Sequence, residues 1–181
     1  MKIAISGKSG CGNSTVSRKV AEQLGFRLVN YTFKTMAEEQ GVSFDEMCEM
    51  AEHDDRWDHH LDRQQVEMAK GGNTVLGSRL AVWVLDDADL RVYLDAPEMV
   101  RVERIHRDPA RSSKTLDQVL AETRERDRRD HNRYVRLYDI DNDDFGFVDL
   151  VIDTTALSPQ EIADRIVAEA RRIADKKGAG R

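Results

Sequence analysis

The sequence has few cysteines and no apolar run long enough to cross a membrane. Only two of its 181 residues are cysteines, Cys11 and Cys48, and they stand far apart without Cys-x-x-Cys spacing. A disulfide framework and a zinc site are therefore not expected, and the composition fits a reducing, cytoplasmic compartment. Because no apolar run approaches ~20 residues, and the first one is too short for a signal peptide, we expect no membrane partner.

The sequence also lacks the basic surplus of a nucleic-acid-binding protein. Its net charge is −6, with 28 basic and 34 acidic residues, so no nucleic-acid partner is expected. Arginines nevertheless concentrate between positions 101 and 136, which favours a small anionic ligand over a long polyanion. With 40% hydrophobic and 34% charged residues, the chain is expected to form one domain over residues 1–181. We expect a monomer, and a dimer stays open.

Hydrophobic patterns along the chain predict an α/β fold. Strand patterns lie at residues 2–6, 26–29, 74–76, 90–94 and 148–152. Helical patterns lie between and after them, at residues 14–24, 31–70 with breaks, 98–107, 116–137 and from Pro159 onward. Because strands alternate with helices, we expect a five-stranded parallel sheet with helices on both faces, that is, a three-layer fold.

A glycine-rich stretch joins the first predicted strand to the first predicted helix. Its glycines permit a tight turn, whose backbone N–H groups and helix N-terminus can hold phosphates. The order Gly7, four residues, Gly12, Asn13, Ser14 matches a P-loop, except that Asn13 replaces the lysine. Ser14 is then the expected Mg²⁺ ligand. The alternative is a turn without a ligand. The predicted ATP-binding residues are Gly7, Lys8, Ser9, Gly10, Cys11, Gly12, Asn13, Ser14 and Thr15.

The missing lysine raises the question of which group supplies its charge. A charge-assisted hydrogen bond to phosphate is worth about 1.5–3 kcal/mol, and Asn13 cannot supply the charge. Lys8 stands at the second position of the loop, where some P-loop ATPases with a deviant motif also carry a lysine. One hypothesis is that Lys8, or an arginine from elsewhere, replaces the charge. The other is that Lys8 is an ordinary exposed loop residue.

A predicted helix in the second half of the chain is unusually rich in arginine. Residues 122–133 read ETRERDRRDHNR, without one apolar side chain. One interpretation is a solvated helix with internal ion pairs, such as Glu122 with Arg126 or Glu125 with Arg129. The other is a lid whose arginines stabilise the charge of a transferring phosphoryl group. Arg126, Arg129, Asp130 and Arg133 fall at helical spacing on one face.

Several segments together resemble the cytidylate kinase family over nearly the whole chain. They are ISGKSGCGNST, VLGSRLAVW, VYLDAP, ETRERDRRDHNRYVRLYDIDNDD and VDLVIDTTALSPQEI, the lid segment being the most specific. The short chain looks like the compact archaeal type. The resemblance implies a P-loop nucleoside monophosphate kinase fold and transfer of the γ-phosphoryl group of ATP to CMP or dCMP with Mg²⁺. It also implies monophosphate-binding helices at about residues 31–70 and a lid at about residues 104–136.

The resemblance further implies roles for individual residues. Arg126 and Arg133 would hold phosphates from the lid and act in catalysis, and Asp130 would contact the nucleoside. Lys8 is a further catalytic candidate because of its place in the glycine loop, not because of the resemblance. The implied monophosphate-binding residues are Lys34, Arg79, Arg101, Arg104, Asp130 and Arg133, with Arg107 as a further candidate. The chain departs from the family pattern at Asn13, at Lys34 in place of an arginine, and at Ser78 in place of a glycine. These departures leave a second function open, that of a nucleotide-binding regulatory pseudo-kinase with little turnover.

Other features permit a functional and a structural interpretation. Cys11 is either a low-pKa thiol at a helix N-terminus or a small space-filling residue, which we favour. Trp57 and Trp83 are expected to pack in the interior, although Trp57 could line a nucleoside pocket. The histidines and acids at positions 53–60 have no zinc-ligand spacing and predict a solvated helix face. The aspartates at 141, 143 and 144 lack the EF-hand pattern of a Ca²⁺ site.

Overall fold

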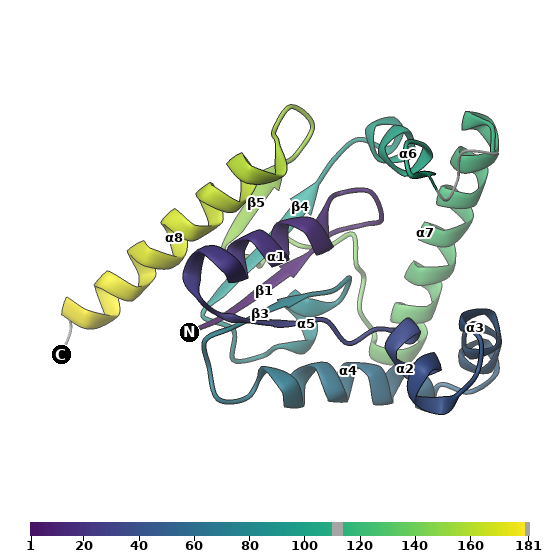
Figure 1. Ribbon diagram of the computed structural model, residues 1–181, viewed down its shortest axis with the longest axis horizontal. Helices are drawn as coiled ribbons and strands as arrows, with labels where there is room; N and C mark the ends of the chain where they lie inside the picture. The colour runs from purple at the N-terminus through teal and green to yellow at the C-terminus, as the bar shows by residue number, and fades with distance from the viewer. Residues whose placement is uncertain (110–113, 180–181) are drawn as a thin grey trace.

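The computed structural model describes residues 1–109 and 114–179, which form a parallel sheet with helices on both faces (Figure 1). Within these residues the sheet has five strands in the order β2-β3-β1-β4-β5, all parallel. The strands are β1 (Lys2–Ser6), β2 (Arg27–Val29), β3 (Thr74–Gly77), β4 (Leu90–Asp95) and β5 (Leu150–Asp153). The predicted five-stranded parallel sheet is therefore confirmed, with strand ends that differ by one or two residues.

The helices follow the predicted order with two refinements. The region at residues 31–70 is divided into three helices, and a short helix at residues 81–84 was not predicted, because four apolar residues show no helical period. The helices are α1 (Asn13–Leu24), α2 (Phe33–Gln40), α3 (Phe44–His53), α4 (Arg56–Ala69), α5 (Ala81–Val84), α6 (Glu98–His106), α7 (Leu116–Tyr138) and α8 (Pro159–Ala179). Among the described residues, no helix combines the length and hydrophobicity that a membrane span requires.

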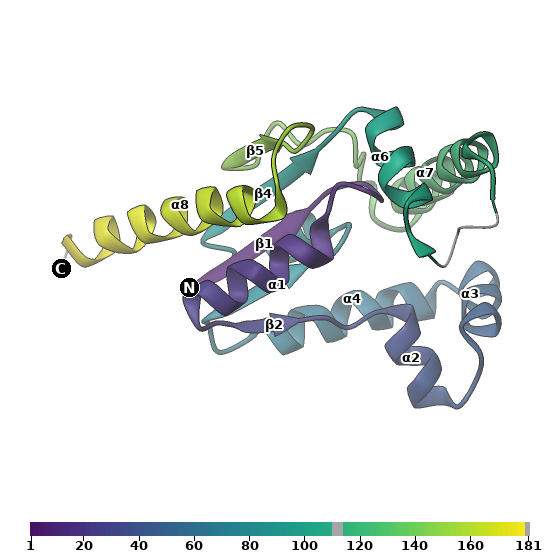
Figure 2. The ribbon, with the colours of Figure 1, turned by 45° about the horizontal axis from the view of Figure 1, so that its top comes forward.

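The core of the sheet consists of two layers, one on each face, and a third buried cluster lies around α2 and α3. Ile3 and Ile5 of β1 are buried against α1 and α8, whereas Ala4 faces α4 and α5. This alternation follows from the two-residue period of a strand. Figures 1 and 2 show α1 and α8 on one side of the sheet and α4 and α5 on the other. The predicted three-layer architecture is thereby confirmed.

Helix α7 lies outside these layers, beside α6 and beyond the carboxyl ends of the strands (Figure 2). Its start is fixed by a reciprocal capping box between Thr115 and Gln118. Its middle carries ion pairs with other partners than expected: Glu125 pairs with Arg128, and Arg129 pairs with Glu52 of α3. The expected Glu125–Arg129 pair is wrong, because a carboxylate on a neighbouring helix is available to Arg129.

The far end of α7 is joined to α4. Tyr138 donates its hydroxyl hydrogen to Asp62 at 2.6 Å, and Arg136 lies 2.5 Å from a carboxylate oxygen of Asp55. Both contacts connect the end of α7, at the boundary of the predicted lid, to the region of the predicted monophosphate-binding helices. The two parts therefore face each other across the end of the sheet.

Candidate functional site

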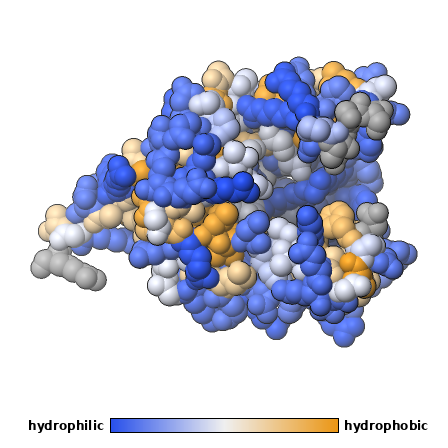
Figure 3. Space-filling model, in the orientation of Figure 1, coloured by the Kyte–Doolittle hydropathy of each residue, from blue (hydrophilic) through white to orange (hydrophobic). Residues whose placement is uncertain are grey.

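A cleft of about 830 Å³ lies at the carboxyl ends of β1, β2 and β3. Its walls are the glycine loop with the start of α1, the segment Asn30 to Lys34, one side of α4, and α7. In the space-filling view, a hollow bordered by hydrophilic side chains separates the part with α6 and α7 from the part with α2, α3 and α4 (Figure 3). Open α/β sheets bind ligands in crevices at this edge. The position alone thus makes the cleft the candidate site.

The glycine loop approaches the cleft with its backbone. Gly10 and Gly12 have φ angles of 85° and 98°, in the left-handed region that favours glycine. A Cβ atom at Gly10 would also lie 2.7 Å from the carbonyl oxygen of Arg101. The loop passes directly into α1, whose first-turn N–H groups have no acceptor within the helix. Backbone donors and the positive end of a helix dipole therefore reach the cleft together.

Asn13, which replaces the expected lysine, closes the loop on itself. Its Nδ2 atom donates a hydrogen bond to the carbonyl oxygen of Gly7 at 2.5 Å, while its buried Oδ1 atom has no hydrogen-bond partner. By this bond the Asn13 side chain holds the start and the end of the loop together.

Lys8 lies in the cleft wall and forms an ion pair. Its Nζ atom is 2.5 Å from Oδ1 of Asp143, and the Lys8 side chain is 27% exposed. Lys8 is therefore not an ordinary exposed loop lysine. Its proposed contact with a phosphate stays a prediction.

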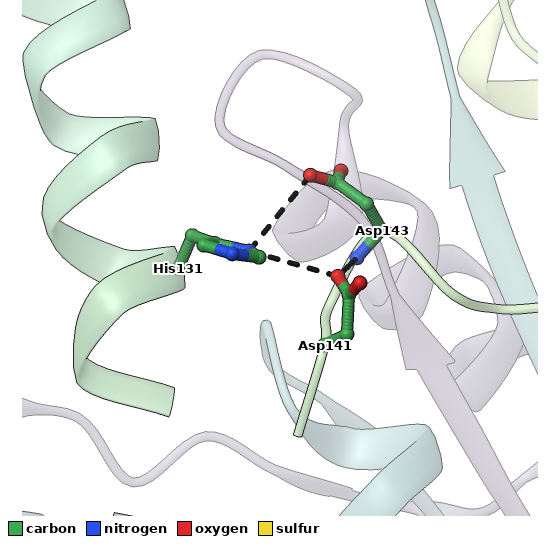
Figure 4. Close-up of side chains that lie close together, drawn as sticks. All are labelled: His131, Asp141 and Asp143. Atoms are coloured by element: carbon green, nitrogen blue, oxygen red, sulfur yellow. Dashed lines mark hydrogen bonds and ion pairs between the residues drawn. The ribbon is translucent and has the colours of Figure 1, made fainter. Parts of the chain in front are cut away.

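The partner of Lys8 belongs to a small cluster in the loop that follows α7. His131 points from α7 toward Asp141 and Asp143 (Figure 4), with its Nδ1 atom 3.6 Å and 3.9 Å from their nearest carboxylate oxygens. These three ligand-type atoms lie within 4.8 Å of one another. The ammonium group of Lys8 supplies a positive charge to this cluster. The cluster thus joins the glycine loop to the lid helix.

Two arginines of α6 support the glycine loop from behind. Arg101 donates to the carbonyl oxygen of Ser9 at 3.1 Å and to Asp127 at 2.8 Å. Arg104 donates to the carbonyl oxygen of Gly10 at 3.3 Å and to that of Thr154 at 2.6 Å. These contacts give carbonyl groups of the loop charged donors and so hold the loop in place. Arg101 is 5% exposed and is absent from the cleft lining, whereas Arg104 lines it.

Asp130 connects two arginines that were expected at the monophosphate. One of its carboxylate oxygens pairs with Arg79, and the other accepts a hydrogen bond from Arg133 at 3.3 Å. Arg79 also donates to the hydroxyl oxygen of Ser9 at 2.8 Å. Asp130 is buried and does not line the main cleft. In this structure it orients the guanidinium groups of Arg79 and Arg133, and its contact with a nucleoside stays a prediction.

Most of the predicted site residues meet in the cleft. Every predicted ATP-binding residue lines it except Cys11, and every predicted monophosphate-binding residue lines it except Arg101, Asp130 and the further candidate Arg107. Among the described residues, six cationic side chains line the cleft, namely Lys8, Lys34, Arg79, Arg104, Arg126 and Arg133, against four acidic ones, namely Asp58, Asp62, Asp108 and Glu122. In a chain of net charge −6, this local excess of positive charge favours an anionic ligand.

One wall of the cleft was missed by the sequence interpretation, which placed a solvated face on α4. Asp58 and Gln65 are each 3% exposed and line the cleft with Asp62. Burial raises the pKa of Asp58 to about 6, although the nearby Arg133 opposes this shift. Burial likewise raises the pKa of Asp62, against the hydrogen bond from Tyr138. The spacing of four and seven residues on one helix face was the signal that could have revealed this wall.

The remaining alternatives for individual side chains are resolved. Cys11 is 1% exposed within the core, and burial raises the pKa of its thiol to about 11, so the low-pKa interpretation is wrong and the space-filling one is confirmed. Trp57 packs with a cluster around α2 and α3 and is absent from the cleft lining. Trp83 packs edge-on against Tyr93 and Phe147.

Comparison with known proteins decides the family. The model of the family described as "Cytidylate kinase-like family" matches residues 2–156. The chain belongs to the cytidylate kinase-like family. Among its curated relatives, cytidylate kinase 2 of Borreliella burgdorferi is 43% identical over 183 residues, which cover 99% of this chain and 100% of the relative. Cytidylate kinase of Pyrococcus furiosus is 40% identical over 162 residues, covering 88% and 83%. The resemblance to cytidylate kinases is confirmed.

The solved structures establish the fold of this cytidylate kinase-like chain. Shikimate kinase from Bacteroides thetaiotaomicron has a TM-score of 0.62 at 14% identity, covering 97% of this chain and 98% of that one. At this level of identity the similarity shows the fold alone, which is that of the P-loop kinases. The segment matched to the family contains the glycine loop, α4 and α7, so all walls of the cleft lie within it.

Proposed function

We propose that this protein is a nucleoside monophosphate kinase that transfers the γ-phosphoryl group of ATP to CMP or dCMP, yielding CDP or dCDP. The observation that carries this proposal is the cationic cleft, in which a phosphate-binding loop faces a second set of arginines across one cavity. Two anionic ligands that must meet at one phosphorus atom need such an arrangement. The names of the curated relatives support the same reaction.

The glycine loop is the proposed site of the triphosphate, bound with Mg²⁺. The side chain of Ser14 stands at the start of α1, is exposed, and lines the cleft, and a hydroxyl oxygen is a ligand type that fits Mg²⁺. Bound there, the ion would neutralise charge on the phosphate oxygens. Ser14 would hold it, the loop N–H groups would bind the phosphates, and Lys8 would contribute a positive charge.

The opposite wall is the proposed site of the monophosphate. Lys34 of α2 and Arg126 of α7 are exposed on the cleft, and Arg133 lies deeper. Lys34 and Arg126 would neutralise the acceptor phosphate and the equatorial oxygens of the transferred group. The acceptor is a phosphate oxygen that is largely ionised at neutral pH, so no general base is needed. Closure of α7 over the cleft would exclude water and so suppress hydrolysis.

One observation favours a second function: the protein could be a regulatory protein that binds nucleotides with little turnover. The residue at the lysine position of the P-loop is Asn13, and the candidate substitute, Lys8, pairs with Asp143. Such a protein would bind Mg·ATP but would not stabilise the charge that develops during transfer. Binding and turnover must therefore be measured separately.

The test is a coupled assay of ADP formation with CMP, dCMP, UMP and AMP, beside calorimetric titration of Mg·ATP. We expect turnover with CMP and dCMP and no turnover without an acceptor. Arg126→Met should lower the rate, whereas Arg128→Met, which alters an exposed arginine paired with Glu125, serves as the matched control. ATP binding without turnover would favour the regulatory function, and the absence of binding would refute both functions.

A further inference from the structure

The side of α4 that faces the cleft carries a polar stripe. Asp58, Asp62 and Gln65 are spaced by four and three residues, so they lie on one face of the helix, and all three line the cleft together with Leu61. Two of them, Asp58 and Gln65, are 97% buried in the structure, since each is only 3% exposed. A buried polar stripe on a cavity wall needs a partner for each of its atoms.

Two acceptor atoms of this stripe have no such partner. Oδ2 of Asp58 and Oε1 of Gln65 are buried without a hydrogen bond. The orientation of the Gln65 amide is defined, because its Nε2 atom donates to the carbonyl oxygen of Tyr31 at 2.8 Å and a carbonyl can only accept. The amide oxygen of Gln65 is therefore the atom that lacks a hydrogen-bond partner. Buried acceptors without a donor destabilise a fold, so their presence in a cavity wall points to a ligand that donates hydrogen bonds.

A donor without a hydrogen bond lies beside Asp58. The Nε atom of Arg133 is buried without a hydrogen bond, and it forms an ion pair with Oδ1 of Asp58 at 3.4 Å. The guanidinium group of Arg133 is also stacked 5.9 Å from the ring centre of Phe33, which lines the same cleft. The lining of the cleft thus offers two acceptors, one donor and an aromatic surface.

We propose that α4 recognises the base of the acceptor monophosphate, with Asp58 and Gln65 accepting hydrogen bonds from the exocyclic amino group of cytosine and Arg133 donating one to a ring acceptor. Cytosine presents an N4 amino donor, which carboxylates accept, beside the ring acceptors N3 and O2. The assignment rests on the proposed function and adds the residues that select the base. It differs from the role that family resemblance implies for Asp130, whose two carboxylate oxygens already contact arginines.

The same atoms disfavour uracil. Its O4 atom is an acceptor at the position of the cytosine amino group, so it would face the Asp58 carboxylate and leave the Gln65 oxygen unpaired. Sites built around buried hydrogen-bonding groups reject ligands that lack the matching group, by up to about 10⁴–10⁵-fold. Selection of cytosine over uracil therefore arises from the unfavourable contacts of uracil as well as from the favourable contacts of cytosine.

The test compares CMP with an analogue that lacks only the amino group, the 5′-monophosphate of pyrimidin-2-one riboside. Calorimetry on the wild-type protein should show the analogue binding about 10–100-fold more weakly. In Asp58→Asn, which retains the shape of the side chain, the ratio of the two dissociation constants should fall toward one. Gln65→Leu should lower the ratio independently. A shift of the ratio isolates the contact with the amino group, because a general loss of structure would weaken both ligands alike.

A control variant and three further outcomes show whether the base assignment or the kinase proposal fails. Glu67→Gln removes a charge from the solvent side of the same helix, where Glu67 pairs with Lys70, and should keep the wild-type ratio. Equal binding of CMP and the analogue to the wild type would overturn the assignment. So would a ratio that survives Asp58→Asn and Gln65→Leu but is lost in Asp130→Asn. Turnover of CMP in the assay above is read separately, so the kinase proposal and the base assignment can fail independently.

Discussion

Asn13 and Gly7 are joined by a hydrogen bond of 2.5 Å, from the side-chain amide of one to the carbonyl oxygen of the other, at the position where a P-loop carries lysine. The residue that looks like a defect in the motif thus fastens the two ends of the loop. The charge of the motif has to come from other side chains, and Lys8, Arg79 and Arg104 all line the cleft near this loop.

Replacing Asn13 with alanine should loosen the loop. We expect the free energy of unfolding to fall by about 0.5–1.5 kcal/mol, because one hydrogen bond is lost. Binding of Mg·ATP should weaken as well, since the freed Gly7 carbonyl can turn toward the phosphates. Denaturant unfolding and calorimetry measure the two effects. Asn132→Ala, at an exposed position of α7 outside the cleft, should change neither. An unaltered stability of Asn13→Ala would contradict the role of this bond.

Replacing Lys8 with alanine should weaken the binding of Mg·ATP by about 10–100-fold, the value of a charge-assisted hydrogen bond. Asp143→Asn is the matched variant, because it removes the partner of Lys8 but keeps the ammonium group. It should leave affinity for Mg·ATP unchanged or raise it. Titration calorimetry on both variants distinguishes the cases. If Lys8→Ala binds Mg·ATP as the wild type does, Lys8 is not the substitute cation.

The raised pKa of Asp58 makes a pH-dependent contribution to stability. In the folded protein its pKa is about 6 against an ordinary value of 3.8, mainly because of burial. Between these values the native state keeps a proton that the unfolded state has lost, so stability falls as pH rises and the loss is complete above about pH 6, reaching roughly 3 kcal/mol.

Asp58→Asn should remove this contribution. The variant should be more stable than the wild type at about pH 8, and the difference should shrink toward zero at about pH 4, where Asp58 is protonated. Denaturant unfolding at several pH values measures it, with Glu67→Gln as a solvent-exposed control on the same helix. A stability difference that does not vary with pH would show that burial does not raise the pKa of Asp58.

Replacing Arg101 with lysine should destabilise the loop. Lysine keeps the charge but lacks the planar fork that contacts both Ser9 and Asp127. We expect a loss of about 1–3 kcal/mol, because a buried acceptor is left without a donor. Arg107→Lys, at an exposed position next to the same helix, should have little effect. If unfolding shows equal stability for the two variants, the buried contacts of Arg101 do not support the loop.

The loop and the strand-helix order could be predicted because their causes are local. Gly10 and Gly12 must adopt positive φ angles, and the apolar periods of two and 3.6 residues are visible in the sequence. The ion pairs were harder to foresee. The spacing of charges predicts that Arg129 pairs with Glu125 of its own helix, yet in the structure it pairs with Glu52, which is far away in the sequence. Local spacing cannot reveal which distant carboxylate the fold brings nearby.

By itself the sequence determined the order of the elements, the glycine loop before α1 and the likeness to cytidylate kinases, since each depends on neighbouring residues or on a continuous motif. Only the tertiary structure decided that Arg101 supports the loop from behind, that Asp130 holds two arginines, and that Asp58 and Gln65 face the cleft. The physical reason is burial: whether a polar side chain is solvated or must find a partner depends on the packing of segments that are distant in the chain.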